Sequence, residues 1–545
     1  AVIDGPARAC GRDARPAVAL VLAAVIAAAL STFDPEEQTL FLVEEAVGLW
    51  ATSASLGSAG IAFGLGVVGV ALDDARLNWT ERARFAAPLG LVGLLVALGL
   101  YVGVGRPGFY GDRLFVVMRQ QADLTAIDQG LEQKARAAAV YGALTQHAES
   151  TQADLRRLLN GFRVDYTPYY LVNALEVDGG PLLGLVLSLR PDVAAVMPSQ
   201  RLRPAVNSAG VAAGSEPGPA APEWNITSIG ADRVWEELGV TGAGVVVGQS
   251  DSGVAGQHPA LAAQYRGRET GDDYNWLDPW EGSRAPVDTG GHGTHTLGSI
   301  LGAGGIGVAP GAEWYGCRNL ARNLGNPALY LDCMQFMLAP YPQAGDAFAD
   351  GDPARGAHVL NNSWGCPPIE GCRPDVLEPA AEALRVAGIF MVASAGNDGP
   401  RCSTIMDPIA NYDAVFSVGA TDSIGDLADF SSRGPVPGAD GLSKPDIAAP
   451  GVDILSAMPD GNYGRMSGTS MAGPHVVGVV ALMWSANPEL IGDIETTERI
   501  LRETTRPFTG RLVAEDCDVS QNPEWAIGAG LVDAYAAVVG AMAER

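Results

Sequence analysis

The chain has 545 residues, of which 18% are charged and 47% hydrophobic, and its 62 Asp and Glu outnumber 35 Lys and Arg to give a formal charge of −27. This acidic excess, without a clustered basic face, argues against nucleic acid as a partner. The length is sufficient for a membrane segment, a small domain and a catalytic domain.

Three long stretches without charges occupy residues 16–33, 46–72 and 85–105. Each reaches or nearly reaches the roughly 20 apolar residues that a helix needs to span a bilayer, so the sequence predicts an all-α transmembrane segment with three helices over residues 1–106. Arginines precede the first stretch and lie between the second and third, whereas the loop at residues 34–45 carries only acids. The positive-inside rule then predicts a multi-pass membrane protein whose remaining part is extracytoplasmic.

Two alternatives for these stretches remain open. The first stretch is short and rich in Ala, like a cleaved signal peptide, although no cleavage site stands out. In the second alternative, all three stretches are buried core helices, but no surrounding domain is large enough to cover them. Because the chain begins with Ala1, the sequence leaves open whether residues precede it and how many spans there are.

Residues 107–203 alternate between strand and helix patterns. The expected elements are a strand starting at Leu114, a charged helix through Tyr141, Leu144 and Leu155, a strand over 169–177, a short apolar helix over 180–189 and a last strand over 190–199. This alternation predicts a small α+β domain. Residues 204–223 are rich in Pro, Gly, Ala and Ser, cannot bury a core, and are expected to form an exposed linker.

Three motifs further along the chain carry residue types suited to acyl transfer. An apolar strand, Val-Val-Val-Gly-Gln-Ser, brings Asp251 into a tight turn, while His292 and Ser470 each open an apolar helical pattern and so lie at a helix N-terminus. A serine hydroxyl is a poor nucleophile until a base takes its proton, and an imidazole titrates near neutrality. We therefore predict Ser470 as nucleophile, His292 as general base and Asp251 as the group that fixes the imidazole tautomer.

A fourth motif, Phe-Met-Val-Ala-Ser-Ala-Gly-Asn397, reads as a buried strand that ends in a Gly-rich turn. The turn presents the amide of Asn397. Its side-chain N–H and the backbone N–H of Ser470 are expected to stabilise the oxyanion that forms during attack. The other histidines are expected to have structural roles: His147, His258, His295, His358 and His475.

Residues 224–543, with Asp, His and Ser in the subtilisin order, resemble the catalytic domain of a subtilase, a subtilisin-like serine endopeptidase. Further matching motifs are Gly-Val-Ala-Pro-Gly-Ala at 307–312, Val-Leu-Asn-Asn-Ser-Trp-Gly at 359–365, Phe-Ser-Ser-Arg-Gly-Pro at 430–435 and Lys-Pro-Asp-Ile-Ala-Ala-Pro-Gly at 444–451. The segment Asn-Asn-Ser-Trp-Gly-Cys-Pro-Pro-Ile-Glu-Gly-Cys is more similar to the bacillopeptidase F type. The resemblance implies an α/β fold over 224–545, a subtilisin-like, doubly wound, mostly parallel sheet with helices on both faces.

Within that family, a small domain ahead of the catalytic domain is a propeptide that assists folding and inhibits the enzyme until it is cut away. The resemblance implies this role for residues 107–203, as an intramolecular inhibitor. Self-cleavage is then expected between Pro198 and Glu223. The alternative is an ordinary interdomain linker that is never cut.

The resemblance also implies that protein or peptide substrates bind in extended form, pairing their backbone with strand edges. The expected pocket walls are small or apolar residues, which suggests an uncharged or aromatic substrate residue beside the scissile bond. For Trp364, capping of the core is an equal alternative. The wall residues are Ser363, Trp364 and Gly365 on one side and Ser394, Ala395 and Gly396 on the other.

No cofactor or metal is required for this chemistry. Subtilases often bind structural calcium, yet the segment that follows His292 lacks the oxygen ligands of a calcium site. The acidic run at 270–275 could supply such oxygens, but a solvated loop is the favoured interpretation, and calcium elsewhere stays open.

Six of the seven cysteines lie in the catalytic segment, and an even number outside the cytoplasm suggests disulfides. A local pair between Cys366 and Cys372 fits their spacing, while fifteen pairings of six cysteines leave the connectivity open. The six are Cys317, Cys333, Cys366, Cys372, Cys402 and Cys517.

Together these patterns predict a membrane-tethered, extracytoplasmic serine endopeptidase that is made as a zymogen and freed by cutting its own linker. A processing peptidase with narrow specificity is one alternative. The alternative from another class is a catalytically silent, membrane-anchored receptor or scaffold with the same fold, against which the intact Asp251, His292, Ser470 and Asn397 weigh.

Overall fold

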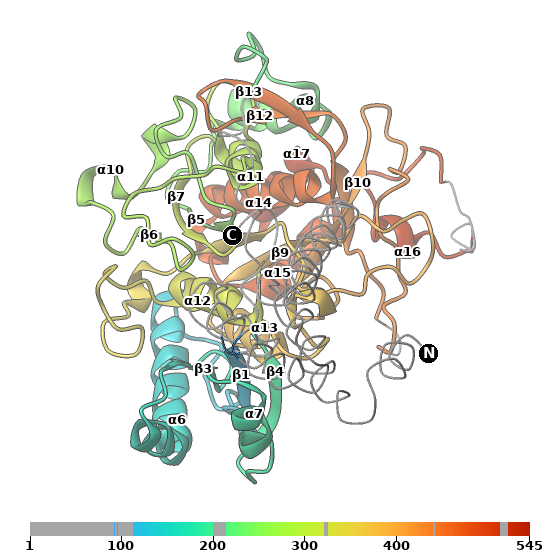
Figure 1. Cartoon of the computed structure of the whole chain (residues 1–545). Coiled ribbons are helices and arrows are strands. Elements are labelled where there is room, and N and C mark those ends of the chain that lie inside the picture. Colours follow the sequence, from blue (N-terminus) through green and yellow to red (C-terminus); the bar gives the residue numbers. More distant parts are fainter. Residues whose placement is uncertain are drawn as a thin grey trace, which may run out of the picture. The chain divides into compact units, whose positions relative to one another are not determined.

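The computed structural model describes residues 92, 95, 113–199, 214–320, 325–439, 442–512 and 521–544. Residues Arg113–Ser199 and Asn207–Arg545 form one compact unit, which contains a small α+β part and a larger α/β part. The small α+β part begins at Arg113 (Figure 1).

The multi-pass membrane localisation predicted from the sequence is corrected by one finding. A spanning helix needs about 20 consecutive apolar residues. Among the residues that the structure describes, no helix is both long enough and apolar enough to cross a membrane. The three stretches on which the prediction depended lie outside those residues, apart from single positions in the third. Membrane tethering therefore has no place in the functional proposal below.

The small α+β part is a four-stranded antiparallel sheet in the order β2-β3-β1-β4 with two helices. Helix α6 buries one side of its surface through residues spaced three or four apart, such as Val140, Leu144 and Ala148, which is the periodicity of an amphipathic helix. The elements are β1 (Arg113–Met118), α6 (Gln133–Phe162), β2 (Tyr166–Tyr169), β3 (Ala174–Asp178), α7 (Pro181–Ser188) and β4 (Val193–Pro198).

One predicted strand is divided in two. The sequence predicts a continuous strand over 169–177, but β2 ends at Tyr169 and β3 begins at Ala174. In between, the backbone N–H groups of Tyr170 and Leu171 donate to the Gln335 side-chain oxygen, at 2.7 and 3.4 Å. These donors are satisfied by a side chain of the larger part, so this segment forms a turn instead of extending the strand.

The larger part contains a seven-stranded sheet in the order β11-β10-β9-β8-β5-β7-β6, and every neighbouring pair is parallel. Its central strands are buried along their length, as expected for a parallel sheet covered on both faces. The strands are β5 (Val246–Asp251), β6 (Trp276–Leu277), β7 (Glu313–Arg318), β8 (Val359–Asn362), β9 (Phe390–Ser394), β10 (Phe416–Thr421) and β11 (Ile447–Pro450).

Helices cover both faces of this sheet (Figure 1). Phe390 and Val392 pack into the core cluster that contains α11 and α14, while Met391 and Ala393 pack into the cluster that contains α12 and α13. Alternate residues of β9 thus serve opposite faces, which is the two-residue period of a strand. The predicted α/β fold with a large parallel sheet is confirmed.

The remaining helices and a hairpin complete the larger part. The helices are α8 (Trp224–Ser228), α9 (Ala231–Arg233), α10 (Gly267–Thr270), α11 (His292–Leu301), α12 (Pro327–Leu338), α13 (Glu378–Val386), α14 (Thr469–Ala486), α15 (Ile494–Glu503), α16 (Glu524–Ile527) and α17 (Ala534–Ala543). A π-helical turn is η2 (Val234–Leu238), and short 3-10 helices are η3 (Ala262–Gln264), η4 (Pro353–Arg355), η5 (Pro368–Glu370) and η6 (Pro488–Leu490). The antiparallel hairpin is β12 (Ile454–Ala457) and β13 (Tyr463–Met466).

Two disulfides of the larger part have both cysteines among the described residues. Cys366 pairs with Cys372, which confirms the local bridge predicted from the sequence, and Cys317 pairs with Cys333. Cys402 is disulfide-bonded as well.

Candidate active site

The four residues predicted to act in catalysis lie at the ends of neighbouring elements. Asp251 is the last residue of β5, and Asn397 follows β9. Because both strands run parallel to β8, their carboxyl ends meet at one edge of the sheet, where α/β folds place their sites. His292 opens α11 and Ser470 is the second residue of α14.

Asp251 and His292 are in direct contact. His292 Nδ1 lies 2.7 Å from Asp251 Oδ1, and the Asp251 side chain is fully buried. Gly293 permits this approach, because a Cβ there would lie 2.2 Å from the Gly253 carbonyl oxygen and 2.9 Å from Asp251 Cβ. Burial lowers the pKa of His292, but the charge and hydrogen bond of Asp251, with a contribution from Asp288, outweigh this and raise the pKa above its usual value.

Ser470 faces a backbone carbonyl. Its Oγ donates to the Ser363 carbonyl oxygen at 3.2 Å, and Ser363 Oγ donates to the Ser470 carbonyl oxygen at 3.0 Å. Within the described residues no hydrogen bond joins Ser470 to His292, although both line the same cavity. Catalytic hydrogen bonds are often long or absent before substrate binds.

The amide of Asn397 is held by the turn that starts α14. Asn397 Oδ1 accepts from the Thr469 backbone N–H at 2.9 Å and from Thr469 Oγ1 at 3.0 Å. Among the described residues, no hydrogen bond uses Nδ2, which is therefore available as a donor. A Cβ at Gly468 would lie 3.7 Å from both Asn397 Nδ2 and the backbone nitrogen of Ser470, so the two predicted oxyanion donors border one small space. The N–H of Ser470 has no helical partner, since it lies in the first turn.

A cavity of about 520 Å³ brings these groups together with the predicted pocket walls. Trp364 is held in its wall by two contacts. The indole N–H donates to the Ser250 carbonyl oxygen at 3.0 Å, and the ring stacks on Tyr330 with centroids 3.9 Å apart. The side chain is 5% exposed, so it packs in the core and borders the cavity at once. The lining includes His292, Asn397, Ser470 and all six predicted wall residues, Ser363, Trp364, Gly365, Ser394, Ala395 and Gly396.

Sequence reasoning missed two acidic residues in this lining, Asp398 and Asp407. Asp398 adjoins Asn397 in the same motif, so its position near the cavity was predictable from the sequence. Asp407 belongs to a loop without a recognisable motif, so only the fold brings it to the cavity.

Residues 242–524 match the Subtilase family, which is more than half of the chain. The chain belongs to this family. It is 35% identical over 428 residues to bacillopeptidase F of Bacillus subtilis (strain 168), a match that covers 73% of this chain and 28% of that protein. It is 34% identical to subtilisin DY of Bacillus licheniformis, a match that covers 49% of this chain and 86% of that protein. It is also 34% identical to subtilisin Savinase of Lederbergia lenta, a match that covers 49% of this chain and 85% of that protein.

The match to bacillopeptidase F spans more residues than 224–545 contains, so it extends into the small part of this subtilase. The subtilisin matches cover only about half of the chain. Similarity to the bacillopeptidase F type therefore includes sequence outside the catalytic segment.

The other histidines of this subtilase have structural partners. His295 Nε2 contacts the Ile454 carbonyl oxygen at 2.9 Å, and burial lowers its pKa to about 3. His475 Nε2 contacts Asn225 Nδ2 at 2.8 Å, and His258 Nε2 contacts the Asn462 carbonyl oxygen at 3.0 Å. Likewise, His147 Nε2 lies 3.0 Å from the Gln120 carbonyl oxygen, and His358 Nδ1 accepts from the Val246 N–H at 3.2 Å.

In the acidic run at 270–275, side-chain oxygens accept hydrogen bonds from other groups of the protein. Asp272 Oδ1 accepts from the Tyr265 hydroxyl at 2.7 Å, Asp273 Oδ1 from the Gln343 N–H at 2.9 Å, and Asn275 Oδ1 from Arg266 Nε at 2.6 Å. Across the described part of the chain, no three His, Cys, Asp or Glu side chains gather as they would around a metal ion.

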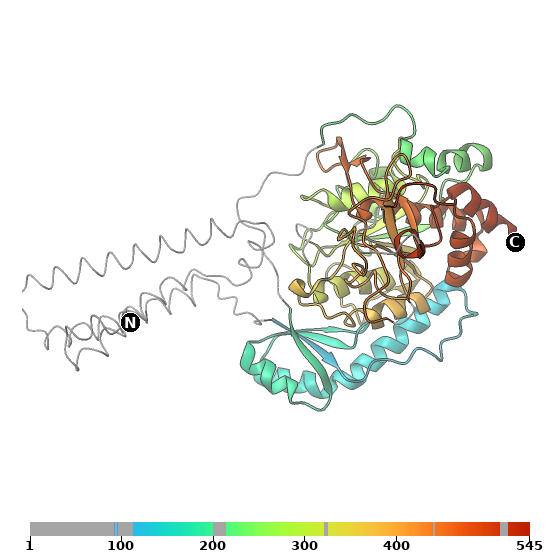
Figure 2. The same ribbon diagram turned by 90° about the vertical axis from the view of Figure 1, so that its right-hand side faces the viewer.

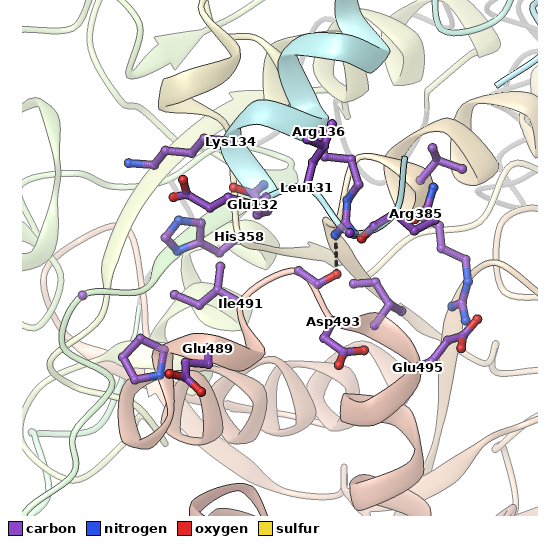
Figure 3. Close-up of a pocket in the computed structure, with 18 residues that line it drawn as sticks. Leu131, Glu132, Lys134, Arg136, His358, Arg385, Glu489, Ile491, Asp493 and Glu495 are labelled. Atoms are coloured by element: carbon purple, nitrogen blue, oxygen red, sulfur yellow. Dashed lines mark hydrogen bonds between the residues drawn. The ribbon is translucent and has the colours of Figure 1, made fainter. Parts of the chain in front are cut away.

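A larger cavity, of about 940 Å³, lies away from these residues, between the start of α6 and the loop at 488–495 (Figure 3). Arg136 Nη2 donates to the Gly492 carbonyl oxygen across this boundary, and Nη1 donates to the Gln129 carbonyl oxygen at 2.9 Å. None of the predicted catalytic residues lines it. We interpret it as a polar interface between the small part and the larger α/β part. The larger part contains the predicted catalytic residues and is hereafter called the catalytic part.

Proposed function

We propose that this subtilase is a serine endopeptidase that hydrolyses peptide bonds through an acyl-enzyme formed on Ser470. The observation that carries the proposal is the 2.7 Å contact between Asp251 and His292 at the cavity that His292 shares with Ser470 and Asn397. Membership of the subtilase family supports the same reaction class.

The reaction follows from the roles of these atoms. Ser470 Oγ turns from the Ser363 carbonyl toward His292, gives its proton to the imidazole and attacks the substrate carbonyl carbon. Asp251 stabilises the imidazolium, while Asn397 Nδ2 and the Ser470 N–H stabilise the oxyanion. The peptide C–N bond breaks as His292 protonates the leaving amine. Water, deprotonated by His292, then hydrolyses the ester.

We further propose that residues 113–199 are the intramolecular inhibitor of this enzyme. Their sheet packs on α12 and α13, since Phe115, Tyr169 and Met197 belong to the same core cluster as those helices. Figure 2 shows α6 running along one side of the catalytic part. The Tyr141 hydroxyl donates to the Phe348 carbonyl oxygen at 2.7 Å, which adds a polar contact to this interface.

The self-cleavage site belongs to the segment between Pro198 and Glu223. At its start, the Pro198 carbonyl oxygen lies 2.5 Å from the position of a Cβ at Gly371, in the disulfide loop that follows the wall residues 363–365. Towards its end, Glu216 pairs with Tyr463 of β13, three residues before the lining residue Met466. Both flanks of the segment therefore contact chain segments that lead to lining residues of the cavity.

The experiment is to express the full chain as wild type and as Ser470→Ala and to follow chain length, N-terminal sequence and casein hydrolysis over time. We expect only the wild type to shorten to a species that begins between residues 199 and 224 and then to cleave casein. If neither chain shortens and neither cleaves casein, the silent scaffold becomes the better description. The contact between Asp251 and His292 disfavours that alternative.

A further inference from the structure

Two carboxylates border the cavity that holds His292 and Ser470, one beside each wall. A Cβ at Gly365 would lie 3.0 Å from Asp407 Cβ and 3.5 Å from its Oδ2, so Asp407 lies directly against this wall residue. Asp398 Oδ2 lies 3.9 Å from the corresponding position at Gly396, on the other wall.

Neither carboxylate has a counter-charge among the residues that the structure describes. Within the described residues, no Lys or Arg lines the cavity, and no ion pair includes Asp398 or Asp407. The charge that acts on Asp407 is that of Asp398, another acid. The cavity is therefore an anionic space beside the nucleophile.

This arrangement is electrostatically unfavourable without a cation. Burial raises the pKa of Asp407, and the negative charge of Asp398 raises it further. Asp407 is partly desolvated and Asp398 is exposed, and both carboxylates border the same cavity. A positive charge that enters this cavity stabilises both of them. An uncharged aromatic side chain would remove water from both carboxylates without replacing its hydrogen bonds.

We propose that this cavity selects substrates with Lys or Arg at the residue whose carbonyl group is attacked, and that Asp398 and Asp407 determine this specificity. The inference rests on the proposed function, because it assigns a substrate class to the same site. The small residues Gly365, Ala395 and Gly396 leave room for the aliphatic stem of a long side chain, and its cationic head meets the carboxylates. The wall residues alone predicted an uncharged or aromatic substrate residue at this position. With the two carboxylates taken into account, we expect a basic residue there.

The test uses the matured full chain and four peptide anilides that differ only in the last residue: Arg, Lys, Phe or Glu. We expect kcat/KM for the Arg and Lys peptides to exceed that for the Phe peptide at least roughly tenfold. Asp407→Asn should lower the ratio of kcat/KM for Arg to that for Phe on the order of 10- to 100-fold, and Asp398→Asn should lower it in the same direction. Asp413→Asn is the matched control, because this exposed acid does not line the cavity, and it should leave the ratio unchanged.

An organophosphorus reagent that labels reactive serines separates the ways in which the test can fail. Labelling of Ser470 in each variant shows that the site is folded. A wild type that is labelled and prefers Phe, with a ratio that neither Asp398→Asn nor Asp407→Asn changes, overturns the basic specificity but leaves the peptidase intact. A wild type that is neither labelled nor active on any of the four peptides overturns the proposed function and the inference with it.

Discussion

Asp251 and His292 show how opposing effects set the protonation of a single imidazole. The His292 side chain is 16% exposed and the Asp251 side chain 0%. Desolvation disfavours the imidazolium, and the adjacent carboxylate favours it. Because the carboxylate effect is larger, the pKa of His292 is raised, and the imidazole stays protonated further into the neutral range than a free histidine does.

This balance predicts a pH dependence. Only the neutral imidazole can accept the Ser470 proton, so kcat/KM should fall as the pH drops through a His292 pKa that lies above 6.5. Asp251→Asn removes the charge that raises the pKa but leaves the burial that lowers it. The midpoint should therefore move to lower pH, and kcat should fall on the order of 10,000-fold. pH profiles of both proteins on one peptide substrate check this, and an unchanged midpoint would contradict it.

Asn397 has a separate predicted effect. Asn397→Ala removes Nδ2 from the space that it shares with the Ser470 N–H, so turnover should fall about 100- to 1000-fold. The oxyanion exists only during the reaction, so KM should change little. Steady-state kinetics on a peptide substrate give both constants. An Asn397→Ala enzyme with normal kcat would show that this amide is not an oxyanion donor.

At the scale of elements, the contact between the β2–β3 turn and α12 joins the small part to the catalytic part. Gln335 is 1% exposed, and its side-chain oxygen accepts from the N–H groups of Tyr170 and Leu171. Phe115 and Met197 bring apolar area to the same interface. The polar contact fixes how the turn docks, and the apolar contacts supply the driving force.

Gln335→Ala should weaken this docking. It leaves buried N–H groups without an acceptor, so in the Ser470→Ala background the free energy of unfolding should fall by about 1–3 kcal/mol. Urea denaturation of the full chain measures the change. Gln521→Ala, at an exposed position, is the control and should stay within about 0.5 kcal/mol of the parent. Equal stability of the two variants would argue against a role for Gln335 in docking.

The elements also show what the sequence could reveal. Asp251, His292, Ser470 and Asn397 each stand next to an apolar strand or helix pattern, so their positions at element ends were predictable from local sequence. The break between β2 and β3 was not, because the acceptor that satisfies the turn, Gln335, is far away in the chain. Asp407 escaped notice for the same reason, since only the fold brings it to Gly365.

At the scale of the whole molecule, Arg113–Ser199 and Asn207–Arg545 form one compact unit. The inhibitor-like sheet thus belongs to the same body as the site that we propose it controls. The two flanks of the connecting segment both contact the larger part, Pro198 at Gly371 and Glu216 at Tyr463. We expect the first cut to be intramolecular, because a linker that is covalently joined to the catalytic part meets its nucleophile at a high effective concentration.

Maturation should therefore be first order. Over an about 100-fold dilution of the unprocessed wild-type chain, the half-time of the first cut should remain constant, because each molecule cuts itself. Gel densitometry after dilution from a denatured or inhibited state gives the half-times. Half-times that lengthen in proportion to dilution would indicate that one molecule cuts another.

The central claim is that Ser470 is an activated nucleophile, and its reaction with a fluorophosphonate probe tests this most directly. Intact-mass and peptide mapping of the matured wild type should show one adduct, located on Ser470, that forms more slowly as the pH falls through the raised pKa of His292. Ser470→Ala should form none. A wild type that carries no adduct, or equal labelling of Ser470→Ala, would contradict the assignment of this site as a serine peptidase centre.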